Sequence, residues 1–349
     1  MGRTSRKSRH RSRRYTRHNK KQPVGKNEQP VGKTQKIKKR FRKSNCHPSI
    51  KIKKDAVDTN LSCLNPKSLQ TIKTAFNRKH PEYKIASNNP IKIWRELQEK
   101  IPKCETETCW LDLIPDFDEK QEILKHFAPE QPIEWKRDKN AWLSNFDIDR
   151  VLQQYEEAYP EFVCLGPTPI DFDHKNENGV CVWEEICKLT LVDQKSRGKT
   201  KIGFIFNLDN SKGPGTHWVS MFCDFSPDTN GKPFVFYFDS TSVKMPNEVA
   251  ELIQRLQTEK MGGNVDGNTQ KFDVYENLKV AHQKSNTECG MYSLFFVITC
   301  LTRKLDGKLQ NGGSAESKLS NSDLIQLFAG NTRIPDEYVE NYRGKYFNA

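Results

Sequence analysis

The sequence predicts an α+β fold, in which helices dominate the first half of the chain and strands gather in the second. Three stretches between residues 66 and 155 carry apolar residues at helical spacing. Three short runs rich in Val, Ile and aromatic residues lie between residues 201 and 239, separated by Gly, Pro, Asn and Asp. Helices and strands in separate stretches are typical of an α+β protein.

The first 54 residues form a basic tail. They hold 21 of the 57 Lys and Arg residues and one acid, Glu28, so the rest of this chain of net charge +13 is mildly acidic. A segment with so few apolar residues cannot offset its ordering entropy, and we expect it to be disordered. Residues 22–26 recur as residues 29–33, and their Pro and Gly favour a linker over a helix.

The tail has the charge needed to contact nucleic acid. Lys and Arg side chains that neutralise phosphates release counterions, which favours the binding of DNA or RNA. Because aromatic residues for base stacking are scarce in the tail, such binding would be independent of sequence. A nuclear-import signal and a solvated tail with no dedicated partner are the alternatives. The candidate contact residues are Arg11, Arg13, Arg14, Lys38, Lys39 and Arg40.

Residues 55–140 are predicted to form a helical region, with helices over residues 66–76 and 91–98. Pro90 suits the first turn of the second helix. The remaining residues, 141–349, are expected to form a second domain.

The second domain is predicted to begin with a helix over residues 145–155, which Pro160 limits. Residues 162–172 are predicted to be a loop because two prolines interrupt them, and residues 180–189 are predicted to be a helix. An amphipathic helix is expected over residues 246–260. The expected strands span residues 201–208, 217–225, 234–239 and 274–280, and the second and third of them form a hairpin around Asn230-Gly231.

The ten cysteines show no spacing typical of a disulfide framework. The N-terminus lacks the apolar segment of a signal peptide, so we expect reduced thiols in an intracellular compartment. Cys104 and Cys109 have no His or Cys pair at zinc spacing nearby, so we predict ordinary thiols and no metal site. No apolar run approaches 18 residues, and we expect no membrane span.

Cys289 is the candidate nucleophile. A polar approach is followed by Cys289-Gly290 and then by an apolar run with helical character. The N–H groups and dipole at a helix N-terminus favour a thiolate. An ordinary core cysteine is the alternative, since free Cys is among the most buried residue types.

Three upstream residues complete a set that suits a thiol protease, which needs a base, an orienting group and an oxyanion donor. His217 opens one predicted strand and Asp239 closes the next antiparallel strand, so the two can be neighbours across the hairpin. Gln283 lies six residues before Cys289, where its amide can donate to a developing oxyanion. Taken singly, a surface histidine and a strand-terminating aspartate are the simpler interpretations.

These motifs together resemble the SUMO-specific and adenovirus-type cysteine protease superfamily. The resemblance rests on residues 215–219 (Gly-Thr-His-Trp-Val), residues 237–240 (Tyr-Phe-Asp-Ser), and Gln283 followed by residues 289–292 (Cys-Gly-Met-Tyr). It covers about residues 140–349. Three further segments resemble the maturation proteases of large cytoplasmic DNA viruses, of the African swine fever virus type: residues 165–172, 207–209 and 334–343.

The resemblance implies a papain-like protease core, with a central mixed or antiparallel sheet flanked by helices and the nucleophile at the N-terminus of a buried helix. By resemblance, Cys289 is the nucleophile, His217 the general base, Asp239 its orienting partner and Gln283 the oxyanion donor. The expected substrate and oxyanion neighbourhood comprises Trp218, Asn207 and Gly290.

The resemblance also implies a function. The viral relatives cut after Gly-Gly in structural polyproteins, and the SUMO branch cuts after the Gly-Gly end of its modifier. We therefore expect a cysteine endopeptidase that cleaves Gly-Gly-Xaa sites in viral core polyproteins during virion maturation. A protease that removes SUMO- or ubiquitin-like modifiers, and a non-enzymatic nucleic-acid-binding virion protein, are the alternatives.

Further expectations concern partners and location. We expect no required cofactor, no membrane partner and a monomer, located in the host cytoplasm at the virus assembly site and packaged in the virion. DNA bound through the tail is hypothesised to stimulate the enzyme. Self-cleavage after Gly262-Gly263 or Gly312-Gly313 is a further hypothesis.

Overall fold

The computed structural model describes residues 41–58, 60–226, 232–259, 272–305 and 318–349. Residues Arg40–Ala349 belong to one compact unit. The six basic residues assigned to nucleic-acid contact, the hairpin loop and both Gly-Gly pairs lie outside the described residues. Within the described part of the chain, no helix is long and apolar enough to cross a membrane.

The last part of the predicted basic tail is folded, which corrects the expectation of disorder up to residue 54. The Phe41 ring packs on Trp94 and Trp110, with ring centroids 5.5 and 5.2 Å apart. Ile50 is buried within helix α1 (Pro48–Lys53). The few apolar side chains of the basic tail thus include two near its end that pack in the structure, which the average composition of the tail did not indicate.

Helices α2 (Pro66–Lys79) and α3 (Pro90–Lys100) confirm the two predicted in the N-terminal region. Each has proline in its first turn and begins after an asparagine whose side chain accepts a backbone N–H, which satisfies an otherwise unpaired donor. The remaining elements are α4 (Phe117–Leu124) and the 3₁₀ helices η1 (Pro81–Tyr83), η2 (Glu107–Leu113) and η3 (Ile133–Lys136).

Five strands form one mixed sheet in the order β1-β2-β3-β4-β5. Strands β2, β3 and β4 are antiparallel neighbours, which confirms the predicted hairpin, whereas β1 and β5 pair in parallel at the edges. The strand bounds are β1 (Phe162–Pro169), β2 (Lys201–Asn207), β3 (Trp218–Asp224), β4 (Phe234–Phe238) and β5 (Asp273–Glu276).

Strand β1 corrects the predicted loop over residues 162–172. Its register against β2 shifts between Leu165 and Thr168, and the Gly166–Pro167 peptide bond between them is cis. Proline is tolerated at bulges of edge strands because it removes only a donor that the irregular ladder does not need. The two prolines therefore mark an irregular edge strand.

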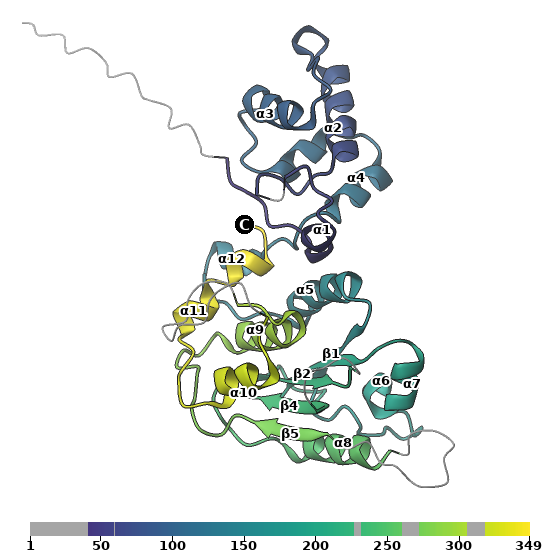
Figure 1. Ribbon diagram of the computed structural model, residues 1–349, viewed down its shortest axis with the longest axis vertical. Coiled ribbons are helices and arrows are strands. Elements are labelled where there is room, and N and C mark those ends of the chain that lie inside the picture. Colours follow the sequence, from purple (N-terminus) through teal and green to yellow (C-terminus); the bar gives the residue numbers. More distant parts are fainter. Residues whose placement is uncertain (1–40, 59, 227–231, 260–271, 306–317) are drawn as a thin grey trace, which may run out of the picture. The chain divides into compact units, whose positions relative to one another are not determined.

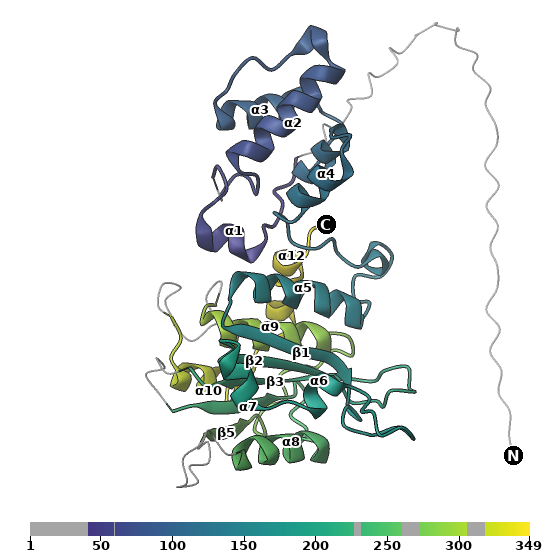
Figure 2. The ribbon, with the colours of Figure 1, turned by 90° about the vertical axis from the view of Figure 1, so that its right-hand side faces the viewer.

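The two faces of the sheet are covered by different helices. Alternate side chains of the strands, such as Phe222 and Phe236, pack with α5 (Asn145–Ala158) and α9 (Cys289–Thr302) in one apolar core. The intervening side chains pack with α8 (Asn247–Thr258) in another. Figures 1 and 2 show α5 and α9 on one side of the sheet and α8 on the other. This sandwich confirms the predicted α+β class and the predicted helices α5, α8 and α9.

Some predicted elements are shorter than expected, and others were missed. The helix expected over residues 180–189 is reduced to α6 (Glu184–Cys187), because Val182 and Trp183 donate backbone hydrogen bonds to His174 and Phe172 instead. The short helices that the sequence patterns did not indicate are α7 (Leu191–Ser196), α10 (Asn321–Ala329), α11 (Asp336–Glu340) and α12 (Arg343–Tyr346).

Six cysteines form disulfides, which corrects the prediction of reduced thiols for these positions. The pairs are Cys46–Cys63, Cys104–Cys109 and Cys181–Cys187, with S–S distances of 2.07, 1.94 and 2.01 Å. The fold brings these sulfurs together, and sequence spacing alone did not reveal it. The free thiols of the described residues are Cys164, Cys223, Cys289 and Cys300.

Candidate active site

Cys289 is the first residue of α9 and carries a free, buried thiol. The helix is apolar along almost its whole length, so burial on all sides fixes its position against the sheet. The positive end of its dipole points toward the Cys289 end, where it favours negative charge. The sequence-based placement of this cysteine at a buried helix N-terminus is confirmed.

His217 and Asp239 meet across the β3–β4 hairpin as expected. His217 immediately precedes β3, Asp239 immediately follows β4, and Nε2 of the imidazole lies 2.8 Å from Oδ1 of the carboxylate. The imidazole also interacts with Cys289. Because Asp239 occupies Nε2, Nδ1 is the ring nitrogen left for the thiol. The histidine therefore lies between a carboxylate and a sulfur.

The surroundings of His217 favour its charged form. Burial lowers the pKa of the imidazole, but hydrogen bonds and charge interactions with Asp239 and Cys289 outweigh it and raise the pKa to about 9 from the ordinary value of 6.5. An imidazolium beside a cysteine stabilises the thiolate form of that cysteine. His217 is therefore held in its charged form at neutral pH, next to the sulfur of Cys289.

Asp239 is fully buried and fixed by two further residues. Oδ1 accepts hydrogen bonds from the backbone N–H and the hydroxyl of Thr241 at 2.8 and 2.7 Å. The side chain of Asn277, just after β5, accepts from the Asp239 N–H at 2.9 Å and donates to its carbonyl at 2.6 Å. Asn277 was not predicted, because nothing in its local sequence connects it to a residue 38 positions away.

Gln283 is anchored beside Asp239 through Ser240. Its Oε1 accepts from the Ser240 hydroxyl at 2.7 Å, and its Nε2 donates to the Ser285 carbonyl at 2.7 Å. A primary amide has two N–H donors, so one remains beyond the bond to Ser285. This geometry fixes the amide in the loop that leads to Cys289.

A small cluster next to Cys289, the site wall, comprises Trp218, Gly290 and Leu143, of which Leu143 was not predicted. The Trp218 indole N–H donates to the Leu143 carbonyl at 3.1 Å, so it is already engaged. A Cβ atom at Gly290 would lie 3.2 Å from the Leu143 Cβ and 3.3 Å from the Trp218 Cδ1, so glycine allows this close packing. Trp142, next to Leu143, is 48% exposed.

Asn207 orders the loop that leads to His217. It pairs with Trp218 across β2 and β3, and its Oδ1 accepts the backbone N–H groups of Asp209 and Thr216, both at 3.0 Å. Gly215, with φ of +92°, lies against the Asn207 amide. The structure therefore connects Asn207 to the position of the histidine.

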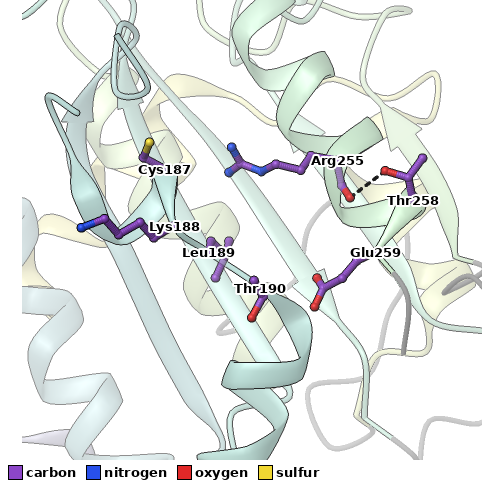
Figure 3. Close-up of a pocket in the computed structure, with 7 residues that line it drawn as sticks. All are labelled: Cys187, Lys188, Leu189, Thr190, Arg255, Thr258 and Glu259. Atoms are coloured by element: carbon purple, nitrogen blue, oxygen red, sulfur yellow. Dashed lines mark hydrogen bonds between the residues drawn. The ribbon is translucent and has the colours of Figure 1, made fainter. Parts of the chain in front are cut away.

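A pocket of about 420 Å³ lies elsewhere, between the α6–α7 segment and the end of α8 (Figure 3). Arg255 donates to the Ile186 carbonyl at 2.6 Å, and Glu259 accepts the Leu191 N–H at 2.6 Å. These bonds fasten α8 to the neighbouring segment. The pocket contains none of the predicted catalytic residues, and no group of three metal-ligating side chains occurs among the described residues.

Comparison with known proteins identifies viral relatives. No protein-family model matches the chain. A thiol protease of Acanthamoeba polyphaga mimivirus is 33% identical over 164 residues, which are 46% of this chain and 48% of that protein. A cysteine protease of African swine fever virus (isolate Tick/Malawi) is 29% identical over 276 residues, which cover 73% of this chain and 89% of the relative. The chain is therefore similar in sequence to cysteine proteases of two large DNA viruses.

The structural comparison supports the same relationship at the level of the fold. A crystal structure of the African swine fever virus protease has a TM-score of 0.52 and 20% identity, covering 87% of this chain and 96% of that one. The resemblance inferred from the sequence motifs is thereby confirmed, and the homologues support a cysteine-type peptidase. The match spans about half the length of the mimivirus relative.

Proposed function

We propose that the chain is a cysteine endopeptidase in which Cys289, His217 and Asp239 form the catalytic triad. The observation that carries the proposal is the position of His217, which contacts Asp239 at 2.8 Å through Nε2 and interacts with Cys289. A base held between an orienting carboxylate and a nucleophile is the arrangement on which thiol and serine proteases rely.

The proposed reaction proceeds through an acyl-enzyme. The Cys289 thiolate attacks the carbonyl carbon of the scissile bond, and the oxygen takes up the electron pair, stabilised by the free N–H of Gln283. The intermediate collapses, the C–N bond breaks, and the His217 imidazolium donates its proton to the leaving amine. Neutral His217 then takes a proton from water, which attacks the thioester and releases the acid and the thiolate.

Access to the sulfur supports a small residue at the cleavage position. Cys289 is only 2% exposed, and the next residue, Gly290, packs so closely against Trp218 and Leu143 that even a methyl group there would be crowded. A substrate residue without a side chain fits such an approach. We therefore propose cleavage after Gly-Gly in viral core polyproteins during virion maturation, which agrees with the viral origin of the relatives.

Removal of a ubiquitin-like modifier is the second candidate function. One African swine fever virus relative is named a SUMO-1 cysteine protease; it is 28% identical, and the match covers 89% of its length. Such modifiers also end in Gly-Gly, so the same narrow approach to Cys289 would suit them. The two functions differ in the partner that presents the Gly-Gly sequence.

Cleavage assays with three substrates test the proposal and separate the candidates. A Gly-Gly-Xaa peptide tests the chemistry, a viral core polyprotein tests maturation, and a SUMO conjugate tests deconjugation. We expect cleavage of the peptide and the polyprotein after Gly-Gly, identified by N-terminal sequencing of the products, and none by Cys289→Ala. Full activity of Cys289→Ala would end the enzyme hypothesis, and preferential cleavage of the conjugate would favour deconjugation.

We also propose that the enzyme acts as a monomer without a required cofactor, in the host cytoplasm and in the virion. The basic tail would hold it on nucleic acid near its polyprotein substrates, and bound DNA would stimulate cleavage. The charge of the tail supports this part of the proposal.

A further inference from the structure

The closing segment of the chain, singled out in the sequence at residues 334–343, packs against the nucleophile stretch. The hydroxyl of the buried Tyr292, one turn into α9, donates to the Ile334 carbonyl at 2.9 Å and lies 3.1 Å from Asp336 Oδ1. The same carboxylate accepts the backbone N–H of Lys284 at 3.2 Å. These contacts take no part in the proposed reaction, although they join the closing segment to the stretch that carries Cys289.

Arg343 makes the most direct contact in this region. Its guanidinium forms two hydrogen bonds with the carboxylate of Glu288, the residue immediately before Cys289: Nη2 donates to Oε1, and Nε donates to Oε2 at 3.2 Å. The Glu288 side chain has no exposed surface, and that of Arg343 is 12% exposed. A carboxylate is therefore buried one residue from the nucleophile, and Arg343 is the cation that pairs with it.

The charges around Glu288 make this pairing consequential. Burial raises the pKa of Glu288, and Glu340 acts in the same direction, whereas the hydrogen bonds from Arg343 and Thr287 oppose them. Tyr292 is the other titratable group facing it from α9. An unpaired negative charge here would oppose formation of a thiolate at Cys289, whose own partner is His217.

Arg343 also holds the segment that leads to the site wall. Its Nη1 donates to the Lys139 carbonyl at 2.7 Å, and its guanidinium lies 4.3 Å from the centre of the Trp135 ring. The Trp135 indole N–H donates to the Ala141 carbonyl at 2.8 Å, two residues before Leu143. One side chain thus contacts both the neighbour of the nucleophile and the segment that places Leu143 against Gly290.

We propose that Arg343 is a positioning residue for Cys289, which neutralises the Glu288 carboxylate and holds the segment before Leu143. This proposal rests on the proposed function, because it assumes that Cys289 reacts as a thiolate. The C-terminal segment would then be part of the condition for an active nucleophile.

Alkylation of Cys289 by iodoacetamide, followed by peptide mass spectrometry between about pH 5 and pH 9, tests the proposal without a substrate. We expect Arg343→Met to move the midpoint of the alkylation profile upward by about one pH unit, as an added nearby negative charge does. The double variant Glu288→Gln/Arg343→Met should return the midpoint close to that of the wild type, because both charges are gone. Lys345→Met is the matched control, since it removes a cation of the same helix that stacks on Tyr342.

The outcomes separate an electrostatic role from a structural one. A double variant that is as impaired as Arg343→Met, or a single variant with the wild-type profile, would overturn the proposal. If Arg343→Met fails to fold, Glu288→Gln alone decides: an uncompensated Arg343 should move the midpoint to lower pH, and an unchanged midpoint would overturn the idea. Absence of peptide cleavage with the expected alkylation shifts would count against the proposed function and leave this proposal intact.

Discussion

Replacement of Asp239 by Asn isolates the charge that holds His217 protonated. In the structure, Oδ1 of Asp239 accepts from His217 and from both donors of Thr241. An asparagine can place its carbonyl oxygen at the same position, where it accepts the same three hydrogen bonds. The imidazole therefore keeps its tautomer and orientation, and the negative charge is lost. An amide N–H2 also takes the place of the buried Oδ2, which has no hydrogen-bond partner in the structure.

The size of the expected effect of Asp239→Asn follows from the pKa of His217. Its rise from 6.5 to about 9 corresponds to about 3 kcal/mol in favour of the imidazolium, which Asp239 and Cys289 supply against the cost of burial. Since Asp239 contributes a hydrogen bond and a charge, we expect Asp239→Asn to lower the pKa of His217 by at least about one unit. The high-pH side of the kcat/KM profile, where the imidazolium loses its proton, should therefore shift to lower pH by at least about one unit.

The assay is cleavage of a Gly-Gly-Xaa peptide across the pH range, with thermal unfolding measured on the same samples. Because the pKa of His217 is raised in the folded state, its contribution to stability is fully present below pH 6.5 and is lost as pH rises to about 9. The difference in Tm between the wild type and Asp239→Asn should therefore shrink over this interval. Asp112→Asn, which alters an exposed ion pair with Lys120, is the control. A high-pH side of the profile that is unchanged in Asp239→Asn would refute the electrostatic role of Asp239.

Three further predictions concern the site wall, a buried histidine and the tail. Gly290→Ala should lower both kcat/KM and Tm, the latter by a few degrees, because its methyl group presses on Leu143 and Trp218; an unchanged kcat/KM would contradict this. Burial lowers the pKa of His282, whose Nδ1 accepts the Ile334 N–H, so the Tm of the wild type should fall as pH drops below 6.5. His282→Gln should weaken this dependence of Tm on pH, and an equal dependence in both proteins would argue against a role for His282. Deletion of residues 1–40 should abolish salt-dependent retention on DNA, and equal retention would exclude the tail as the DNA contact.

The catalytic candidates were predictable because local rules place each of them at the end of an element, and the resemblance to a protease family links Cys289 to the other two. An antiparallel hairpin places the start of one strand beside the end of the other, so His217 and Asp239 could be paired without knowing the rest of the fold. Cys289 could be placed because an unbroken apolar run after a polar approach predicts a buried helix. In each case, one or two neighbouring elements determine the position of the residue.

The supporting residues could not be predicted because they reach the site from distant parts of the chain. Leu143 meets Trp218 from 75 positions away, and Arg343 meets Glu288 from 55 positions away, so each contact depends on the packing of several elements. The same applies to Cys46 and Cys63, whose separation of 17 residues carries no pairing information by itself. Strand β1 was missed because its prolines outweighed its apolar residues, although an irregular edge strand accepts both.

The residues proposed to carry out the chemistry lie at the ends of β3, β4 and α9, whereas the residues that determine their charge and access belong to segments outside these elements. Asn277 holds Asp239, Leu143 closes the wall, and Arg343 pairs with the carboxylate beside Cys289. A chain that folded its sheet but failed to dock its C-terminal segment would contain every residue of the proposed triad and still lack the environment in which Cys289 is expected to react. The alkylation profile of Cys289 therefore reports on the docking of the C-terminal segment as well as on the nucleophile itself.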